Sequence, residues 1–314
     1  MTESKARLIY RKYGTYIILA VLVIGLSIGA EGFFSVNNLT NILRTTSVYV
    51  ILGCGMTFVM LSGCIDLSVG SIVALSGCVS ALYMSKGGSM MIGVLLSIGV
   101  GVLCGFINGF CIAKLKVPFF ITTIGMMYAA SGIALVITHE TPISGLPESF
   151  KFWGARTVGI IPMQAIIAAI FFAICFFVLR RTKLGRYTYA IGSNSRTAKL
   201  SGVNVDRYMI IIYTLNGFAA ALAGIVVASR LSIGSPLIGD GYDIDAIAAA
   251  ALGGVSMSGG EGSIVKTIIG AFILCVIRTG LNILGISTSN QKIIIGIVLI
   301  VVVAVDMLDK RKAE

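Results

Sequence analysis

Charge is scarce in this sequence. Only 12% of the 314 residues are charged, whereas 57% are hydrophobic, and the mean hydropathy is +0.98. A soluble domain carries about 25% charged residues, because its surface must be covered by groups that interact well with water. The deficit therefore excludes an ordinary soluble domain and indicates that lipid surrounds much of the chain.

Motifs of metal, nucleotide and hydrolytic chemistry are missing as well. His139 is the one histidine, and the seven cysteines show no CxxC spacing, so neither a zinc site nor a disulfide framework is indicated. No GxxxxGK[ST] or HExxH segment occurs. We expect a chain that is not an enzyme and that binds no cofactor of its own.

Apolar runs dominate what is present. A helix needs about 20 mostly apolar residues to cross a bilayer, and helices satisfy their own backbone polar groups there. The sequence predicts an all-α polytopic membrane protein with about ten transmembrane helices in a single domain, residues 1–314. The predicted spans are Gly14 to Ala30, Ser47 to Leu61, Leu67 to Met84, Met90 to Ala113, Phe119 to Thr138, Pro162 to Leu179, Tyr208 to Ser229, Ile264 to Leu284 and Ile293 to Val305, with a shorter, alanine-rich run from Tyr242 to Val255.

The net charge of +11 does not indicate nucleic-acid binding, because the basic residues sit in clusters between apolar runs. In the ten-span arrangement most of them fall on one side, which the positive-inside rule makes cytoplasmic. That side holds the tails 1–13 and 306–314 and the loop 180–207, so both termini are predicted to be cytoplasmic. This result requires an even number of spans, and the short run from Tyr242 must then cross.

Two segments resemble each other. Leu61 to Ser68, running on to Gly77, aligns with Ile238 to Asp245, running on to Gly254. The two enter their spans from opposite sides, which predicts an inverted repeat with short or broken helices. Chance similarity is the alternative, since glycine and alanine are common in such helices.

Polar side chains inside or beside apolar runs are the candidates for a solute path. An ionisable group at membrane depth is costly and usually faces a cavity or a partner. The aspartates can instead cap helices, the neutral groups can join helices, and Arg278 can extend toward the surface. The candidates are Asp66, Ser68, Asn108, Thr122, Asn216, Asp243, Asp245 and Arg278.

The basic loop 180–207 contains a short helix signature. Ser193 and Asn194 can cap a helix over Ser195 to Ser201, and Gly202 can end it in the left-handed conformation. A short helix held between two spans is suited to receive a push from a cytosolic partner. A solvated connector that only fixes topology is the alternative.

This loop also carries a resemblance to a known family. Arg196-Thr-Ala198-Lys-Leu-Ser-Gly202 resembles the EAA-type pattern with which permeases of ABC importers dock on their ATPases, although Arg196 stands where many members carry glutamate. That departure removes the expected charge pairing with the ATPase. Over nearly its whole length the chain resembles the permease of bacterial ribose and related monosaccharide ABC importers. The further segments that carry the likeness are Gly63 to Ser71, Leu252 to Ser256, Gly259 to Gly262 and Thr279 to Leu284.

The resemblance implies a homodimeric permease in the bacterial inner membrane. It implies two cytosolic ATPase modules that hold ATP and Mg, a periplasmic or extracellular sugar-binding protein, and a small sugar such as ribose as the solute. An ion-coupled secondary transporter, using Asp66, Asp243 or Arg278, is the alternative from another class. The docking residues implied by the resemblance are Ser195, Arg196, Thr197, Ala198, Lys199, Leu200, Ser201 and Gly202.

Overall fold

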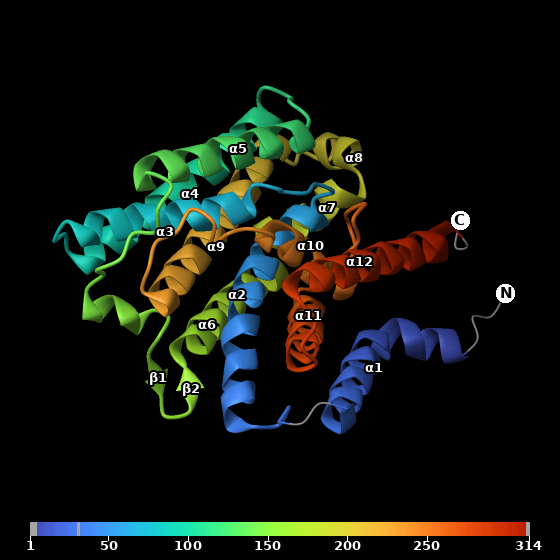
Figure 1. Ribbon diagram of the computed structural model, residues 1–314. Helices are drawn as coiled ribbons and strands as arrows, with labels where there is room; N and C mark the ends of the chain where they lie inside the picture. The colour runs from blue at the N-terminus through green and yellow to red at the C-terminus, as the bar shows by residue number, and fades with distance from the viewer. Residues whose placement is uncertain (1–4, 30–31, 312–314) are drawn as a thin grey trace.

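Helices make up most of the computed structural model, which describes residues 5–29 and 32–311 (Figure 1). A 3-10 helix, η1 (Glu148–Phe152), and a small antiparallel hairpin, β1 (Thr157–Val158) with β2 (Ile161–Pro162), lie in the segment 139–162 between two of the α-helices. The α-helices of the described residues are α1 (Lys5–Gly29), α2 (Val36–Leu61), α3 (Val69–Ser85), α4 (Met90–Ala113), α5 (Phe119–Thr138), α6 (Met163–Arg181), α7 (Lys183–Ser193), α8 (Ser195–Leu200), α9 (Val205–Leu231), α10 (Tyr242–Leu252), α11 (Ile264–Ile283) and α12 (Thr288–Arg311).

Each predicted span overlaps a helix, and the bounds of α4 and α5 are those predicted. Within the described residues, six helices are long and apolar enough to cross a membrane: α2, α4, α5, α6, α9 and α11. Shorter apolar stretches lie in α1, α3 and α12. The 11 residues of α10 rise only about 16 Å, roughly half of a hydrocarbon core. This helix therefore does not cross on its own, and a total of ten spans stays a prediction.

The predicted tails are largely helical. Residues 5–13 belong to α1 and residues 306–311 to α12, whereas residues 1–4 and 312–314 lie outside the described part of the chain.

The centre of the molecule is formed by α2 and α9, whose apolar stretches are 83% and 72% buried. In Figure 1 these helices and α10 lie in the middle, with α4 and α5 on one side and α1, α11 and α12 on the other. Lipid provides no hydrophobic force between helices, so close backbone packing through small residues takes its place. Gly101, Gly105 and Gly109 of α4 provide it, for a β-carbon on Gly105 would lie 2.3 Å from the Tyr213 carbonyl oxygen of α9.

The outer helices have apolar faces turned away from this centre. The apolar stretch of α5 is only 17% buried, and that of α6 is 28% buried. Large side chains such as Tyr128, Val136 and Phe177 are exposed there. Such faces suit contact with lipid or with another membrane protein.

The chain between α9 and α10 runs back along α3. A β-carbon on Gly234 would lie 2.4 Å from Ala81, late in α3, and one on Gly239 would lie 1.8 Å from the carbonyl oxygen of Gly70, near its start. The segment therefore descends antiparallel to α3, and α10 continues from the point where α3 begins. The two segments that the sequence pairs as a repeat thus meet at their helix starts.

Candidate functional site

Four of the predicted polar candidates come together at the start of α3. The carboxylate of Asp66 accepts hydrogen bonds from the Ser68 amide at 2.9 Å, from the Ser68 hydroxyl at 2.6 Å and from Asn216 of α9 at 2.9 Å. Asn108 of α4 donates to the Ser68 hydroxyl at 2.9 Å. We call Asp66, Ser68, Asn108 and Asn216 the α3 cluster.

The α3 cluster is closed. All four side chains have 0% exposure, and the partners of Asp66 are neutral amides and a hydroxyl. Asp66 accepts from the backbone just before α3, as a cap does, and it also joins α4 and α9 to that end. Because burial of a carboxylate is tolerated only when it is well hydrogen-bonded, the cluster acts in this conformation as a structural junction, not as an open path.

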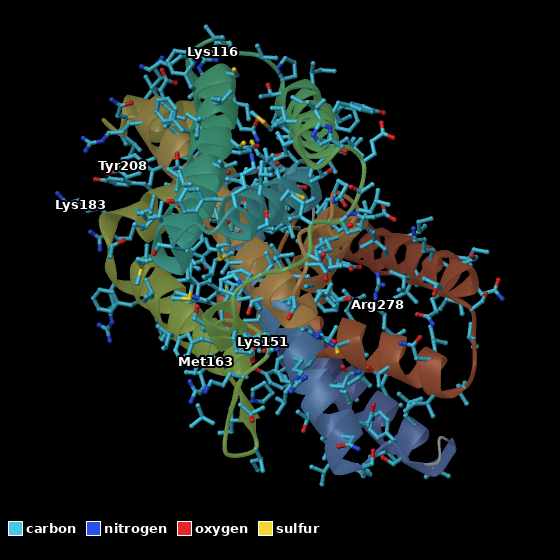
Figure 2. The ribbon with its side chains drawn as sticks, turned by 60° about the vertical axis from the view of Figure 1, so that its left-hand side comes forward. Lys116, Lys151, Met163, Lys183, Tyr208 and Arg278 are labelled. Carbon is cyan, nitrogen blue, oxygen red and sulfur yellow. The ribbon has the colours of Figure 1, made fainter. Side chains whose placement is uncertain are left out.

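A second cluster lies at the start of α10. Arg278 of α11 donates to Asp245 at 2.5 Å, and its guanidinium lies 6.0 Å from the ring centre of Tyr49 on α2. The side chain of Asp245 is 3% exposed and that of Arg278 is 26% exposed. Figure 2 shows Arg278 on α11. We call Tyr49, Asp245 and Arg278 the α10 cluster.

Two predicted candidates are members of neither cluster. Thr122 is half-buried on α5 and donates within its own helix to the Pro118 carbonyl at 3.2 Å. For Asp243, a solute-path candidate, helix capping was the alternative, but Gly241 occupies the cap position with a φ of +83°. The carboxylate of Asp243 faces the start of α3 near Gly70.

The predicted helix in the basic loop is present as α8. Its start is capped by Asn194, whose side-chain oxygen accepts from the Thr197 amide at 2.9 Å, and Gly202 follows its end with a φ of +84°. Of its six residues only Ala198 is buried, whereas Leu200 is 83% exposed. The helix therefore presents Leu200 as a single apolar side chain at the surface of the basic loop.

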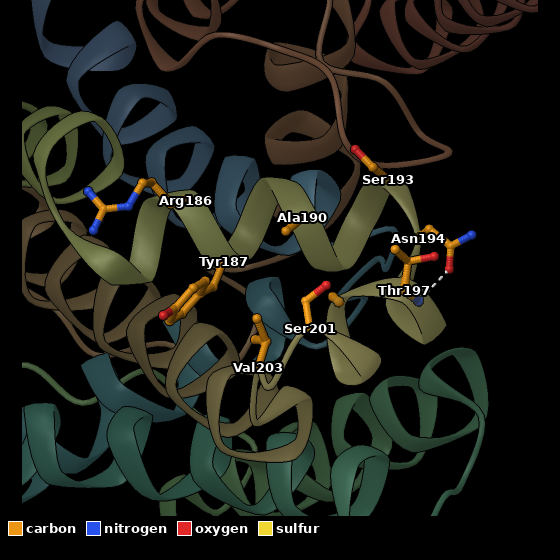
Figure 3. A pocket seen from close by; sticks show the side chains of 9 residues that line it. Arg186, Tyr187, Ala190, Ser193, Asn194, Thr197, Ser201 and Val203 are labelled. Atoms are coloured by element: carbon orange, nitrogen blue, oxygen red, sulfur yellow. Dashed lines mark hydrogen bonds between the residues drawn. The ribbon is translucent and has the colours of Figure 1, made fainter.

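A cavity of about 490 Å³ opens between α7 and α8 (Figure 3). Both helices and the segment that leads into α9 form its walls. The lining residues are Arg186, Tyr187, Ala190, Ser193, Asn194, Thr197, Ala198, Ser201 and Val203.

The far end of α7 touches the irregular turns that follow α2 and α10. A β-carbon on Gly192 would lie 1.8 Å from the Leu61 carbonyl oxygen, to which the Gly260 amide donates at 2.9 Å. The hydroxyl of Tyr189 donates to the carbonyl of Gly262 at 2.9 Å. Because backbone meets backbone with no side chain between, a displacement of α7 has to move both turns.

The loop between α4 and α5 lies at the end of the molecule where α7 and the start of α9 also lie. Lys116 binds Asp206, at the start of α9, at 2.6 Å, and Tyr187 of α7 packs edge-on against Tyr208 of α9 with 4.8 Å between ring centres. Figure 2 shows Lys183 and Tyr208 close together, away from Lys151. These contacts group basic residues that were predicted to share one face.

Comparison with known proteins identifies the family of this chain. Residues 38–303 match the family described as branched-chain amino acid transport system / permease component. The chain belongs to this permease family.

Individual relatives of this permease match nearly end to end. The ribose import permease protein of Escherichia coli K12 is 41% identical over 308 residues, 96% of this chain and 95% of that protein. The ribose import permease protein of Bacillus subtilis is 40% identical, covering 97% and 94%, and the D-allose transport system permease protein of E. coli K12 is 38% identical, covering 96% and 93%. No solved structure was found to match. The resemblance to permeases of ribose and related sugar ABC importers is therefore confirmed, and membership of this family implies a transporter rather than an enzyme.

Sequence reasoning missed parts of this permease site. It predicts a loop over the residues that form α7, and it does not single out Tyr49 or Gly192. The glycine of the Ile191-Gly-Ser sequence is a signal that could have indicated a close approach, but its partner 131 positions earlier, Leu61, is visible only in the fold.

Proposed function

We propose that this permease is the membrane-spanning subunit of an ATP-driven importer that carries a ribose-like monosaccharide across the bacterial inner membrane. The observation that carries the proposal is the pairing of an exposed helix, α8, with a rigid connection from α7 to both irregular turns. Such an arrangement can receive a push at the surface and deliver it to the interior. The names of the relatives, for ribose and D-allose, favour a monosaccharide over a branched-chain amino acid.

The partners follow from this assignment. A cytosolic ATPase that holds ATP and Mg would dock on residues 195–202 and in the cavity beside them, and an external sugar-binding protein would deliver the solute. A second copy of this chain would complete the path, for which the outward apolar faces of α4 and α5 offer a surface. Both termini would lie in the cytoplasm with α7 and α8.

Transport would proceed by alternating access. Movement of the ATPase would displace α7 and α8, and the contact of Gly192 with Leu61 would carry the displacement to the turns after α2 and α10. These turns lead to broken helices, which line solute sites in many transporters. ATP binding and hydrolysis in the partner would supply the energy, by making it favour first one and then the other of two arrangements of the permease.

Uptake measurements test the function. Cells that lack other ribose importers would express this chain with its ATPase and binding protein, and labelled D-ribose and D-allose would be supplied. We expect uptake of one or both sugars that stops when ATP is depleted and continues when ion gradients are collapsed. Uptake with the reverse dependence would contradict the proposal and indicate an ion-coupled transporter.

Docking is tested at Ala198, the buried residue of α8. Ala198→Trp forces α8 away from its seat, whereas Ala198→Ser fits the same space and is the matched control. We expect the tryptophan variant to insert normally in the membrane but to lose uptake and to bind the ATPase weakly in detergent. Normal uptake by this variant would remove the docking assignment.

A further inference from the structure

An exposed ion pair joins the segment before α10 to the start of α12. The carboxylate of Asp240, two residues before α10, lies 2.9 Å from the ammonium of Lys292, early in α12. The side chain of Asp240 is 72% exposed and that of Lys292 is 62% exposed. Leu237, three residues before Asp240, is 74% exposed. We call Leu237, Asp240 and Lys292 the α10–α12 face.

The depth of this face follows from the helices behind it. α3 and α9 run side by side in the same direction, because a β-carbon on Gly224 would lie 2.5 Å from the Val73 carbonyl oxygen and, one turn later, one on Gly77 would lie 3.4 Å from Ala228. Gly70 comes three residues before Val73 on α3. Its level is therefore roughly 15 Å from the end of α9 and roughly 24 Å from the start of α9.

Asp240 lies close to this level. The backbone of Gly239 touches that of Gly70, with no room for a β-carbon between them. The 27 residues of α9 extend about 40 Å and the hydrocarbon core is about 30 Å thick, which leaves about 5 Å of the helix at each end. The backbone beside Asp240 is therefore roughly 10 Å inside the nearer boundary of the hydrocarbon core.

Lipid does not suit this face, for two reasons. Ionisable side chains at membrane depth almost always face the protein interior or a water-filled cavity, because lipid cannot solvate their charges. In addition, residues 232–241 are not helical. Non-helical backbone at membrane depth is tolerated only where it is buried in protein or lines a water-filled cavity. Since Leu237 and Asp240 are exposed, either water or another protein surface has to meet them.

The ion pair favours water over a dry protein contact. A surface packed on Asp240 and Lys292 would strip water from both charges, and the attraction between buried charges often fails to offset that cost. The pair also has no net charge, so it suits a neutral solute better than an anion or a cation. Leu237 adds an apolar side chain, and a few polar groups beside apolar ones are typical of sites for small molecules.

We propose that the α10–α12 face lines the water-filled solute path and binds a neutral, polyhydroxylated solute. Asp240 accepts a hydrogen bond from one hydroxyl group, Lys292 donates to a neighbouring hydroxyl, and Leu237 contacts the carbon skeleton. This inference rests on the proposed transport function, in which a second copy completes the path and keeps lipid from its open side. The presence of water at the face is measurable without any sugar.

The first test measures how fast a charged, water-soluble thiol reagent labels new cysteines in membranes opened to both sides. Asp240→Cys and Lys292→Cys report on the face from two elements. Tyr128→Cys is the matched control, because Tyr128 is 72% exposed at the middle of the apolar helix α5. Peptide masses separate each new cysteine from the native ones. We expect both face positions to be labelled about tenfold or more faster than the control, since lipid suppresses the thiolate that reacts.

The second test measures sugar uptake by Asp240→Ala, Lys292→Ala and the double variant. We expect each single variant to lose about tenfold in uptake, because a hydrogen bond between a charged group and the solute is lost. Unfolding temperatures in detergent should stay native, since an exposed pair contributes little to stability. Lys151→Ala breaks the exposed pair with Glu148 on η1, 2.7 Å long, and is the matched control that should transport at the native rate.

The proposal is overturned if either face cysteine, inserted in normal amounts, reacts no faster than Tyr128→Cys, because lipid or a second surface then covers the face. Uptake at the native rate by the double alanine variant also overturns it, since the face then has water but no contact with the solute. Failure of the proposed function gives a different result. The native importer then takes up no monosaccharide, whereas labelling of the face cysteines, which needs neither sugar nor ATP, stays fast.

Discussion

Asp66 is a single ionisable side chain on which three helices depend. It is fully buried, and the hydrogen bonds described for it come from Ser68 and Asn216. Asp66→Asn keeps the shape but turns an amide N–H toward one of these donors, so at least one buried group loses its partner. We expect a loss of stability of about 1–3 kcal/mol, the usual cost of an unsatisfied buried polar group. Thermal unfolding in detergent measures it.

The control for this residue is Asp240→Asn. The carboxylate of Asp240 is 72% exposed and pairs with Lys292 in contact with solvent, where ion pairs contribute little. The unfolding temperature of Asp240→Asn should equal that of the native chain. Equal unfolding temperatures for the Asp66 and Asp240 variants would show that the α3 cluster does not hold the helices together.

At the scale of the element, α7 connects the surface to the interior, and Gly192 makes the connection. Gly192→Ala places a methyl group against the Leu61 backbone, which has to move. We expect uptake to fall by about tenfold or more, equivalent to a barrier about 1.4 kcal/mol higher, with normal amounts of protein in the membrane. Gly132→Ala on α5, where nothing lies within 4 Å, should transport at the native rate. Equal rates for the two variants would exclude α7 as the route of transmission.

The elements also show what a sequence can predict here. The bounds of α4 and α5 and the ends of α8 follow from local signals, namely apolar length, an asparagine cap and a terminal glycine. The length of α10 does not follow from local signals, because the residues after Leu252 form a turn against α11 and do not continue the helix. The junction of Asp66 with Asn108 and Asn216 was predicted only as a set of separate candidates. Their proximity depends on the packing of α3, α4 and α9, which no local pattern encodes.

At the scale of the whole molecule, the positive-inside rule predicts that α7 and α8 lie in the cytoplasm. Arg196 of α8 and Glu148 of η1 are exposed and belong to opposite predicted sides. A cysteine at each position, labelled by a membrane-impermeant maleimide in intact cells, tests the orientation against the unmodified chain as background. We expect Glu148→Cys to be labelled and Arg196→Cys to be labelled only after the membrane is opened. Labelling of Arg196→Cys in intact cells would place the α8 surface outside, away from ATP, and an ATPase could not then drive this permease through α7.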